Sequence, residues 1–182
     1  SYVGATPIAD LSENSTEAQW CNTNYIPLKH AVLAERTWSF AEEVAEVSSP
    51  TQAVGAGFLY AIPDNAVRVY RCYSQLDPAI QANWQRRGKD VVTDYDGTVY
   101  MVLTAGDSLE ANFPPMFAQA LAGRLAMEMA MPIARSAQLL NAMLQLYEQK
   151  LSAAAAADGS EARSERHDST ELVSARYGGY QL

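Results

Sequence analysis

The chain has 182 residues, of which 48% are hydrophobic, and it carries a formal net charge of −8. This length supports one compact core with a small appended lobe rather than two independent domains. The acidic balance and the lack of a Lys/Arg run argue against tight nucleic-acid binding by this chain alone, although an acidic wall suits a channel through which DNA slides. No apolar run approaches the roughly twenty residues of a membrane span and no signal peptide is visible, so we expect neither a membrane partner nor export.

A first helix is predicted over residues 16–35, where Ser15 or Thr16 can cap the start. Apolar side chains recur there at helical spacing: Trp20, Cys21, Tyr25, Leu28, Val32 and Leu33. Pro27 predicts a kink or a break, because its ring removes a donor and crowds the preceding turn.

Short β-rich segments follow, at residues 39–47, 57–63, 66–73, 89–94 and 98–104. The last two flank Asp94-Tyr95-Asp96-Gly97, and an Asp-Gly pair between such runs predicts a β-hairpin. Val99, Met101 and Leu103 alternate with more polar residues, which predicts a half-buried strand.

Two further helices are predicted near the C-terminus. In the first, which begins near Asn112 with Pro114 and Pro115 in its first turn, large residues recur every fourth position beside a row of alanines. The second covers residues 136–157 and closes with an alanine run and Gly159. The two are expected to form an antiparallel hairpin, with these core or subunit-interface residues: Phe117, Leu121, Leu125, Met127, Met129, Leu140, Leu144 and Tyr147.

Residues 160–182 are mixed in charge and poor in large apolar side chains until Leu172. They cannot fold alone, so they are disordered or ordered on a partner, and the aromatic and glycine-rich terminus favours a partner. The expected fold class is α+β: an antiparallel helical bundle with a small inserted antiparallel β-lobe and an extended C-terminal tail. The expected division is a helical body from residues 1–39 and 108–158, a β-lobe over 40–107, and a tail over 159–182.

Few residues suggest catalysis. The histidines are His30 and His167, and no serine elbow, phosphate loop or metal-ligand motif surrounds either. Asp94 and Asp96 are better explained by turn chemistry, and the acidic cluster Glu42, Glu43 and Glu46 by a solvated face. Cys21 and Cys72 have no ligand-like spacing, so we expect reduced thiols. We therefore expect no enzyme activity, no cofactor and no metal.

The aromatic residues allow two interpretations. Trp20, Trp38 and Trp84, with several tyrosines, could stack on single-stranded nucleic acid, and Gln85-Arg86-Arg87 beside Trp84 keeps that alternative open. Core and interface packing is the favoured interpretation. Met127, Met129 and Met131 lie on consecutive faces of one helix, which favours assembly with other subunits.

Several short sequence segments, spread along nearly the whole chain, occur in an order and at a spacing typical of one protein family. They are Gly4-Ala5-Thr6-Pro7-Ile8, a helix with Ala18 and Cys21, Trp38-Ser39-Phe40-Ala41, Tyr60-Ala61-Ile62-Pro63-Asp64, a strand with Val67, Arg68 and Val69, the turn at Asp96-Gly97, residues 117–126, Pro132-Ile133, and the helix with Tyr147-Glu148. In this order they resemble the head-to-tail adaptor, or tail tubular protein A, family of short-tailed phages (podoviruses). Family members carry a further helical stretch before Gly4, which implies a trimmed N-terminus, and Ser39 stands where Asn is more usual.

The resemblance implies a structural virion protein at the head–tail junction, assembled in the host cytoplasm. Its partners would be the portal protein, a tail nozzle protein of the tail tubular protein B type, and itself in a ring of twelve copies, through which genomic DNA passes without specific binding. The β segments between Phe40 and Thr104 would face the nozzle. The portal-contact candidates are Leu172, Val173, Tyr177, Gly178, Gly179 and Tyr180.

Two alternatives remain. One is a virion factor that grips DNA in the portal–tail channel, which salt-sensitive binding would reveal. The other is a small phage enzyme such as a tail-associated hydrolase, which the missing catalytic constellation disfavours.

Overall fold

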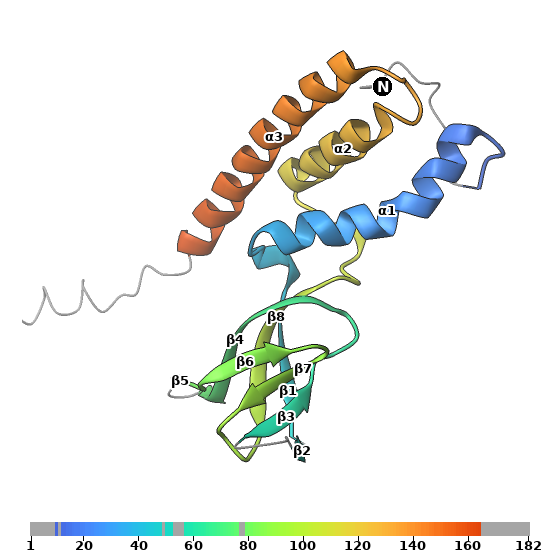
Figure 1. Cartoon of the computed structure of the whole chain (residues 1–182). Helices are drawn as coiled ribbons and strands as arrows, with labels where there is room; N and C mark the ends of the chain where they lie inside the picture. Colours follow the sequence, from blue (N-terminus) through green and yellow to red (C-terminus); the bar gives the residue numbers. More distant parts are fainter. Residues whose placement is uncertain (1–9, 11, 49, 53–56, 77–78, 165–182) are drawn as a thin grey trace, which may run out of the picture.

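Three α-helices and two four-stranded antiparallel sheets form the part of the chain that the computed structural model describes, residues 10, 12–48, 50–52, 57–76 and 79–164. The fold is therefore mixed α+β. The helices lie together at one end of the molecule and the sheets at the other (Figure 1). None of the described helices is long and apolar enough to cross a membrane.

The first helix, α1, covers Thr16–Glu35, as predicted. The Ser15 hydroxyl caps it by accepting a hydrogen bond from the Ala18 N–H at 3.3 Å. The helix runs through Pro27 without ending, so the expected break is wrong. Figure 1 shows its axis bending instead. A bend is the common response to proline when the turns on either side stay packed, and Val32 and Leu33 beyond it are fully buried.

The β part consists of two sheets that face each other (Figure 1). The first has the order β1 (Glu42–Val47), β8 (Val99–Ala105), β4 (Ala66–Leu76) and β5 (Ala79–Gln81). The second has the order β2 (Thr51–Gln52), β3 (Phe58–Ala61), β7 (Asp90–Thr93) and β6 (Trp84–Arg87). Their core includes the fully buried side chains of Tyr60, Cys72, Val91, Met101 and Leu103.

The hairpin predicted around Asp94-Tyr95-Asp96-Gly97 does not form. Strand β7 pairs with β3 and β6, whereas β8 pairs with β1 and β4, so this turn crosses from one sheet to the other. The Tyr60 hydroxyl lies 2.9 Å from the Tyr95 carbonyl and 2.7 Å from the Gly97 carbonyl, and it accepts a bond from the Gly97 N–H at 3.1 Å. The buried Tyr60 side chain from β3 therefore fixes the turn that leads from β7 in one sheet to β8 in the other. Because β8 is central in its sheet, it is almost wholly buried rather than half-buried.

A hairpin that sequence analysis missed joins β6 to β7. Gly88 and Lys89 form its two-residue loop between the paired residues Arg87 and Asp90. Gly88 has φ of +66°, which suits glycine at the first position of such a loop. The Gly-Lys pair between short runs of strand-forming residues was the available signal.

The last two helices, α2 (Pro115–Met129) and α3 (Ala137–Ser164), lie side by side and antiparallel (Figure 1). A short 3₁₀ turn, η2 (Glu110–Asn112), precedes α2, and Pro115 is the first residue of the helix. Gly123 allows close packing, because a Cβ there would lie 3.4 Å from the Tyr147 Cα. Helix α3 continues through Gly159, so the helix end and tail start expected there are wrong.

Candidate functional site

The helix residues expected at the core or at a subunit interface are mostly core residues of this chain. Phe117, Leu121, Met127, Met129 and Tyr147 are buried. The side chains of Leu125 and Leu140 are half-buried against the helical core, whereas Leu144 is exposed. Met131, which was expected to contact other subunits together with Met127 and Met129, is also exposed. Leu144 and Met131 are therefore the most accessible of these helix residues.

An aromatic cluster ties the helices to the start of the sheets. Phe117 on α2 packs edge-on against Trp38 at 5.0 Å, Phe40 at 4.8 Å and Phe113 at 4.9 Å between ring centroids. The Trp38 Nε1–H donates to the Val32 carbonyl at 3.2 Å. Edge-to-face pairs at these distances add stability beyond the burial of their area. The cluster therefore joins the end of α1, the short turn η1 (Ser39–Ala41) and α2.

A charged network crosses the three helices. The Tyr147 hydroxyl donates to Glu35 Oε1 at 2.8 Å. Arg124 lies 3.7 Å from the same Glu35 oxygen and 2.9 Å from a Glu128 oxygen, and its guanidinium lies 5.4 Å from the centre of the Tyr147 ring. Burial raises the pKa of Tyr147, and the Glu35 carboxylate raises this pKa further.

This network predicts a loss of stability at alkaline pH. Because the phenol pKa of Tyr147 is raised by folding, its contribution is fully present below the ordinary pKa of about 10 and is lost as pH rises above that value. We expect Tyr147→Phe to flatten the fall in unfolding free energy above about pH 10, measured by urea denaturation at a series of pH values. The exposed Tyr95→Phe is the control, and an equal slope in both variants would contradict the assignment.

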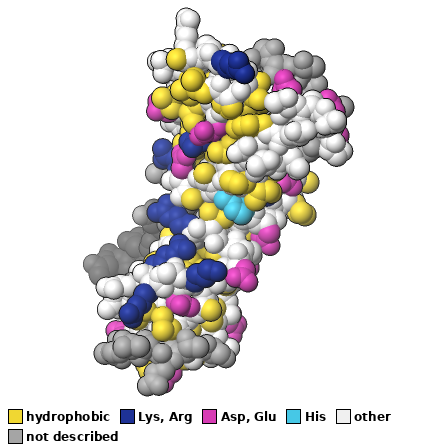
Figure 2. Space-filling model, turned by 45° about the vertical axis from the view of Figure 1, so that its right-hand side comes forward, with side chains coloured by type: hydrophobic (Ala, Val, Ile, Leu, Met, Phe, Trp, Pro, Cys, Tyr) yellow, Lys and Arg dark blue, Asp and Glu magenta, His cyan; other side chains and the backbone are white. Residues whose placement is uncertain are grey.

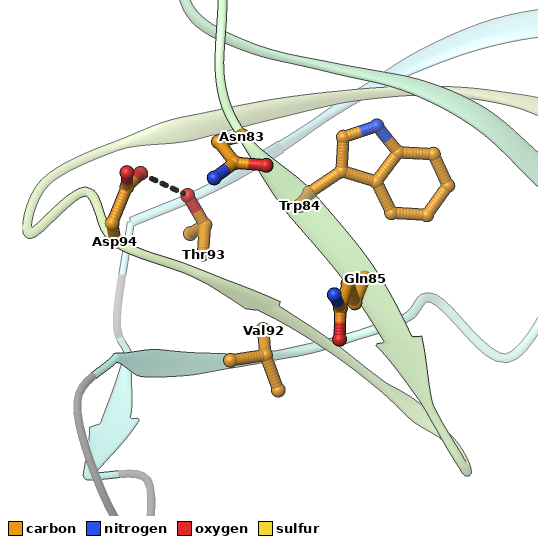
Figure 3. A pocket seen from close by; sticks show the side chains of 6 residues that line it. All are labelled: Asn83, Trp84, Gln85, Val92, Thr93 and Asp94. Atoms are coloured by element: carbon orange, nitrogen blue, oxygen red, sulfur yellow. Dashed lines mark hydrogen bonds between the residues drawn. The ribbon is translucent and has the colours of Figure 1, made fainter.

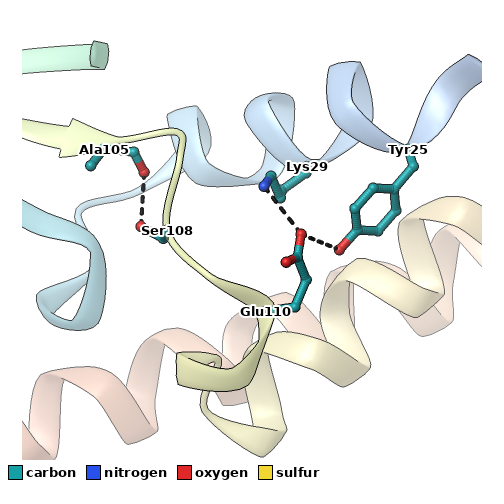
Figure 4. Close-up of polar contacts among 5 residues, drawn as sticks. All are labelled: Tyr25, Lys29, Ala105, Ser108 and Glu110. Atoms are coloured by element: carbon teal, nitrogen blue, oxygen red, sulfur yellow. Dashed lines mark hydrogen bonds and ion pairs between the residues drawn. The ribbon is translucent and has the colours of Figure 1, made fainter. Parts of the chain in front are cut away.

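A second polar cluster joins α1 to the segment between β8 and α2 (Figure 4). Lys29 is buried on α1, and its Nζ lies 3.3 Å from Glu110 Oε1. The Tyr25 hydroxyl lies 3.3 Å from the same oxygen, and nearby the Ser108 hydroxyl donates to the Ala105 carbonyl at 3.0 Å. Burial, followed by the charge of Glu110, raises the pKa of Tyr25 to about 12. A hydrogen bond from its own backbone lowers the pKa of Glu110, and Lys29 lowers it further.

The junction between helices and sheets is closed by direct contacts. Arg68 on β4 donates to the Ala34 carbonyl near the end of α1 at 3.0 Å. The Ser39 N–H and hydroxyl donate to the Asp158 carboxylate on α3, at 3.0 and 2.6 Å. Gly106, directly after β8, packs closely against His30 of α1. The two ends of the molecule are thus held together by side chains from α1, β4 and α3.

We expect Gly106→Ala to lower the unfolding free energy by about 1–3 kcal/mol. A Cβ at this position would lie 2.7 Å from Val67 Cγ2 and 2.8 Å from His30 Nε2, closer than packed atoms tolerate. Gly159→Ala in α3, where the added Cβ would meet nothing within 4 Å beyond its chain neighbours and its own helix backbone, is the matched control and is expected to stabilise by up to about 1 kcal/mol. Urea denaturation measures both, and equal effects would contradict the close contact.

The described candidates for chemistry lie on separate elements, and His167 lies outside the described residues. Glu42, Glu43 and Glu46 lie along β1, where Glu43 accepts a bond from Asn65 at 3.1 Å. Asp94 and Asp96 belong to the turn between the sheets, far along the chain from His30. Within the described ranges, no group of three or more His, Cys, Asp or Glu residues could hold a metal ion. Both cysteines are free, and burial raises the pKa of the Cys72 thiol to about 12.

A shallow pocket of about 210 Å³ lies beside the β6–β7 hairpin (Figure 3). Its lining residues are Asn83, Trp84, Gln85, Val92, Thr93 and Asp94. Figure 3 shows the Trp84 indole extending away from Asp94, and the Thr93 hydroxyl is 3.4 Å from that carboxylate. The pocket offers amide, hydroxyl and carboxyl groups, and its lining residues include no His, Cys or Lys.

Sequence analysis missed the charged residues of the junction: Lys29, Glu35, Glu110, Arg124 and Asp158. Charged side chains normally face water, so these residue types alone do not indicate tertiary contacts. Only Arg124 and Glu128, four residues apart on one helix, carried a local signal of pairing.

The expected portal-contact residues, Leu172, Val173, Tyr177, Gly178, Gly179 and Tyr180, lie outside the described residues. Comparison with known proteins finds no protein-family model and no curated protein that matches the chain.

Proposed function

We propose that the chain is a structural virion protein, a subunit of the adaptor ring that joins the portal to the tail nozzle of a short-tailed phage and continues the DNA channel. The observation that carries the proposal is the order and spacing of segments that resemble the head-to-tail adaptor family, from Gly4 to Glu148. In this role the body would be a helical bundle with an inserted β-lobe, and residues 165–182 would form an extended tail.

The arrangement of the described residues suits a coupler between two different partners. The strands from β1 to β8 are inserted in the chain between α1 and α2, and they lie at the opposite end from the loop between α2 and α3 (Figure 1). The contacts of Arg68, Ser39 and Asp158 join these ends. A chain with two separate, firmly joined ends can hold a portal at one end and a nozzle at the other.

Repetition of the subunit around a ring would make weak individual contacts sufficient for attachment to the portal. In a ring, every subunit presents the same tail to the portal, so weak individual contacts add up to firm attachment. The protein would act by geometry, and its sequence would need no catalytic group.

The experiment that tests the proposal is sedimentation of the purified chain, alone and mixed with the portal of the same phage. We expect a ring-sized complex when portal is present. A chain that sediments unchanged in the presence of portal would overturn the adaptor function.

A DNA-gripping virion factor is the second candidate, and one observation favours it. Exposed basic residues gather on β4, β6 and the turn after β6 despite the acidic balance: Arg68, Arg71, Arg86, Arg87 and Lys89. Figure 2 shows Lys and Arg side chains clustered over one side of the end that carries the sheets. Gripping predicts duplex binding that falls steeply with rising salt, whereas an adaptor shows little binding at any salt.

A further inference from the structure

The two sheets leave four terminal strands with an unpaired edge among the described residues. These are β1 and β5 in the first sheet and β2 and β6 in the second. The chain passes from β1 to β2 and from β5 to β6 through short connections. The edges of β1 and β2 therefore lie on one side of the paired sheets, and those of β5 and β6 on the opposite side (Figure 1).

The β1 side is acidic with an apolar centre. Glu42, Glu43 and Glu46 on this strand are exposed, and no Lys or Arg occurs in β1. Val44 lies among them with 48% of its surface exposed. Asn65 donates to Glu43 and the Tyr70 hydroxyl lies 3.5 Å from Glu42, and both of these partners are neutral. The charge of Arg71 on β4 interacts with Glu42 and offsets part of the acidic charge, so this side keeps a negative balance.

The opposite side is basic and also has apolar residues. Arg86 and Arg87 are exposed on β6, and Lys89 is exposed in the following turn. Ile80 on β5 and Leu76 at the end of β4 are 49% and 46% exposed. Asp90 lies opposite Arg87 in the hairpin and offsets part of this charge, so the side keeps a positive balance.

We propose that β1 of one copy pairs with β6 of the next copy, edge to edge. An unpaired edge is a template for a further strand, and charge decides which strand is accepted. Two β1 edges repel each other, as do two β6 edges, whereas β1 and β6 attract. Because the attracting edges lie on opposite sides of one molecule, the contact is head-to-tail and repeats from copy to copy, as ring formation requires. Val44 packs beside the exposed apolar residues of the neighbouring copy.

This inference rests on the ring assembly proposed above, but the contact itself can be tested without portal. The test places Glu46→Cys on β1 and Gln85→Cys on β6 in a chain that also carries Cys21→Ser. Cys72 stays, since it is fully buried. A short bismaleimide, which tolerates a shift in strand register, then links neighbouring copies, and a denaturing gel separates the products.

The double-cysteine chain is expected to give a ladder that extends beyond the dimer, and each single-cysteine chain is expected to remain a monomer. A dimer from Glu46→Cys alone would show pairing between two β1 edges and overturn the proposal. Absence of linked products from the folded double-cysteine chain would also overturn it. Raising salt to about 1 M, where the Debye length falls to about 3 Å, is expected to weaken the ladder.

Charge reversal tests the selectivity in the same cysteine background. Glu42→Lys with Glu43→Lys is expected to abolish the ladder, as is Arg86→Glu with Arg87→Glu. The chain with all four changes restores opposite charges and is expected to recover the ladder. If it stays monomeric while circular dichroism shows it folded, the charge argument fails.

Portal binding separates this inference from the proposed function. A ladder from a chain that does not bind portal would support the edge contact and remove the adaptor function. A ring that binds portal but gives no edge cross-links would support the adaptor function and overturn the edge contact. The chain with Arg86→Glu and Arg87→Glu is also tested for binding to duplex DNA in a gel mobility-shift assay. If these changes abolish DNA binding but leave the cross-linked ladder intact, the two arginines bind nucleic acid and the edge contact is overturned.

Discussion

Replacing Phe117 with alanine is expected to lower the unfolding free energy by about 3–5 kcal/mol, the largest loss of any single substitution proposed for this chain. Phe117 is 1% exposed and lies within 5.0 Å, between ring centroids, of Trp38, Phe40 and Phe113. Its removal leaves a cavity at the point where α1, η1 and α2 meet. Urea denaturation followed by circular dichroism measures the loss.

Met116→Ala is the matched control, because Met116 precedes Phe117 on the same helix and is 44% exposed. Its replacement is expected to change the unfolding free energy by no more than about 0.5 kcal/mol. A loss at Phe117 as small as that at Met116 would show that the aromatic cluster does not hold the helices and sheets together.

Removing residues 165–182 is expected to reduce portal attachment by about tenfold or more, which corresponds to about 1.4 kcal/mol or more of binding free energy. The cut belongs after Ser164 and not after Gly159, since α3 continues to Ser164 and Asp158 near its end holds Ser39. The helices and sheets are expected to keep their urea midpoint, because none of the described contacts is removed. Cosedimentation with the portal measures the loss.

The full-length chain with Tyr177→Ser and Tyr180→Ser is the companion variant, because it keeps the length of the tail and removes its aromatic anchors. A loss in both variants assigns portal contact to these side chains. Unchanged attachment of the chain cut after Ser164 would contradict a portal-binding tail.

Local signals predicted the starts of α1 and α3 to within one residue, whereas α2 begins at Pro115 rather than near Asn112. The Ser15 hydroxyl caps α1 as expected, and Pro115 occupies the first position of α2. Such signals act within one turn of helix, so they can be recognised in a short stretch of sequence. They fail where distant contacts prevail. Gly159 is a common stop residue, yet α3 passes through it beside the Asp158 contact with η1.

The sheet core and the charged strand edges were also predictable from the sequence only in part. The alternation of Val99, Met101 and Leu103 correctly identified core residues of the sheets. The opposite charges of β1 and β6 are also present in the sequence, at Glu42 and Glu46 and at Arg86 and Arg87. Their positions on opposite sides follow only from the pairing order of the strands.

The sequence by itself determined the three helices and the longer strands, because periodicity, caps and prolines act over a few residues. The short strands β2, β5 and β6 were not predicted. Only the tertiary structure decided how the strands pair. The turn at Asp96-Gly97 would suit a hairpin, but β7 finds its partners in β3 and β6, and the buried Tyr60 hydroxyl holds the crossing between sheets. The burial of Lys29 also depends on tertiary structure. Its partner Glu110 lies 81 residues away in the chain, so no local pattern indicates the pair. The free energy of such contacts depends on which segments fold against each other, and no local pattern encodes that choice.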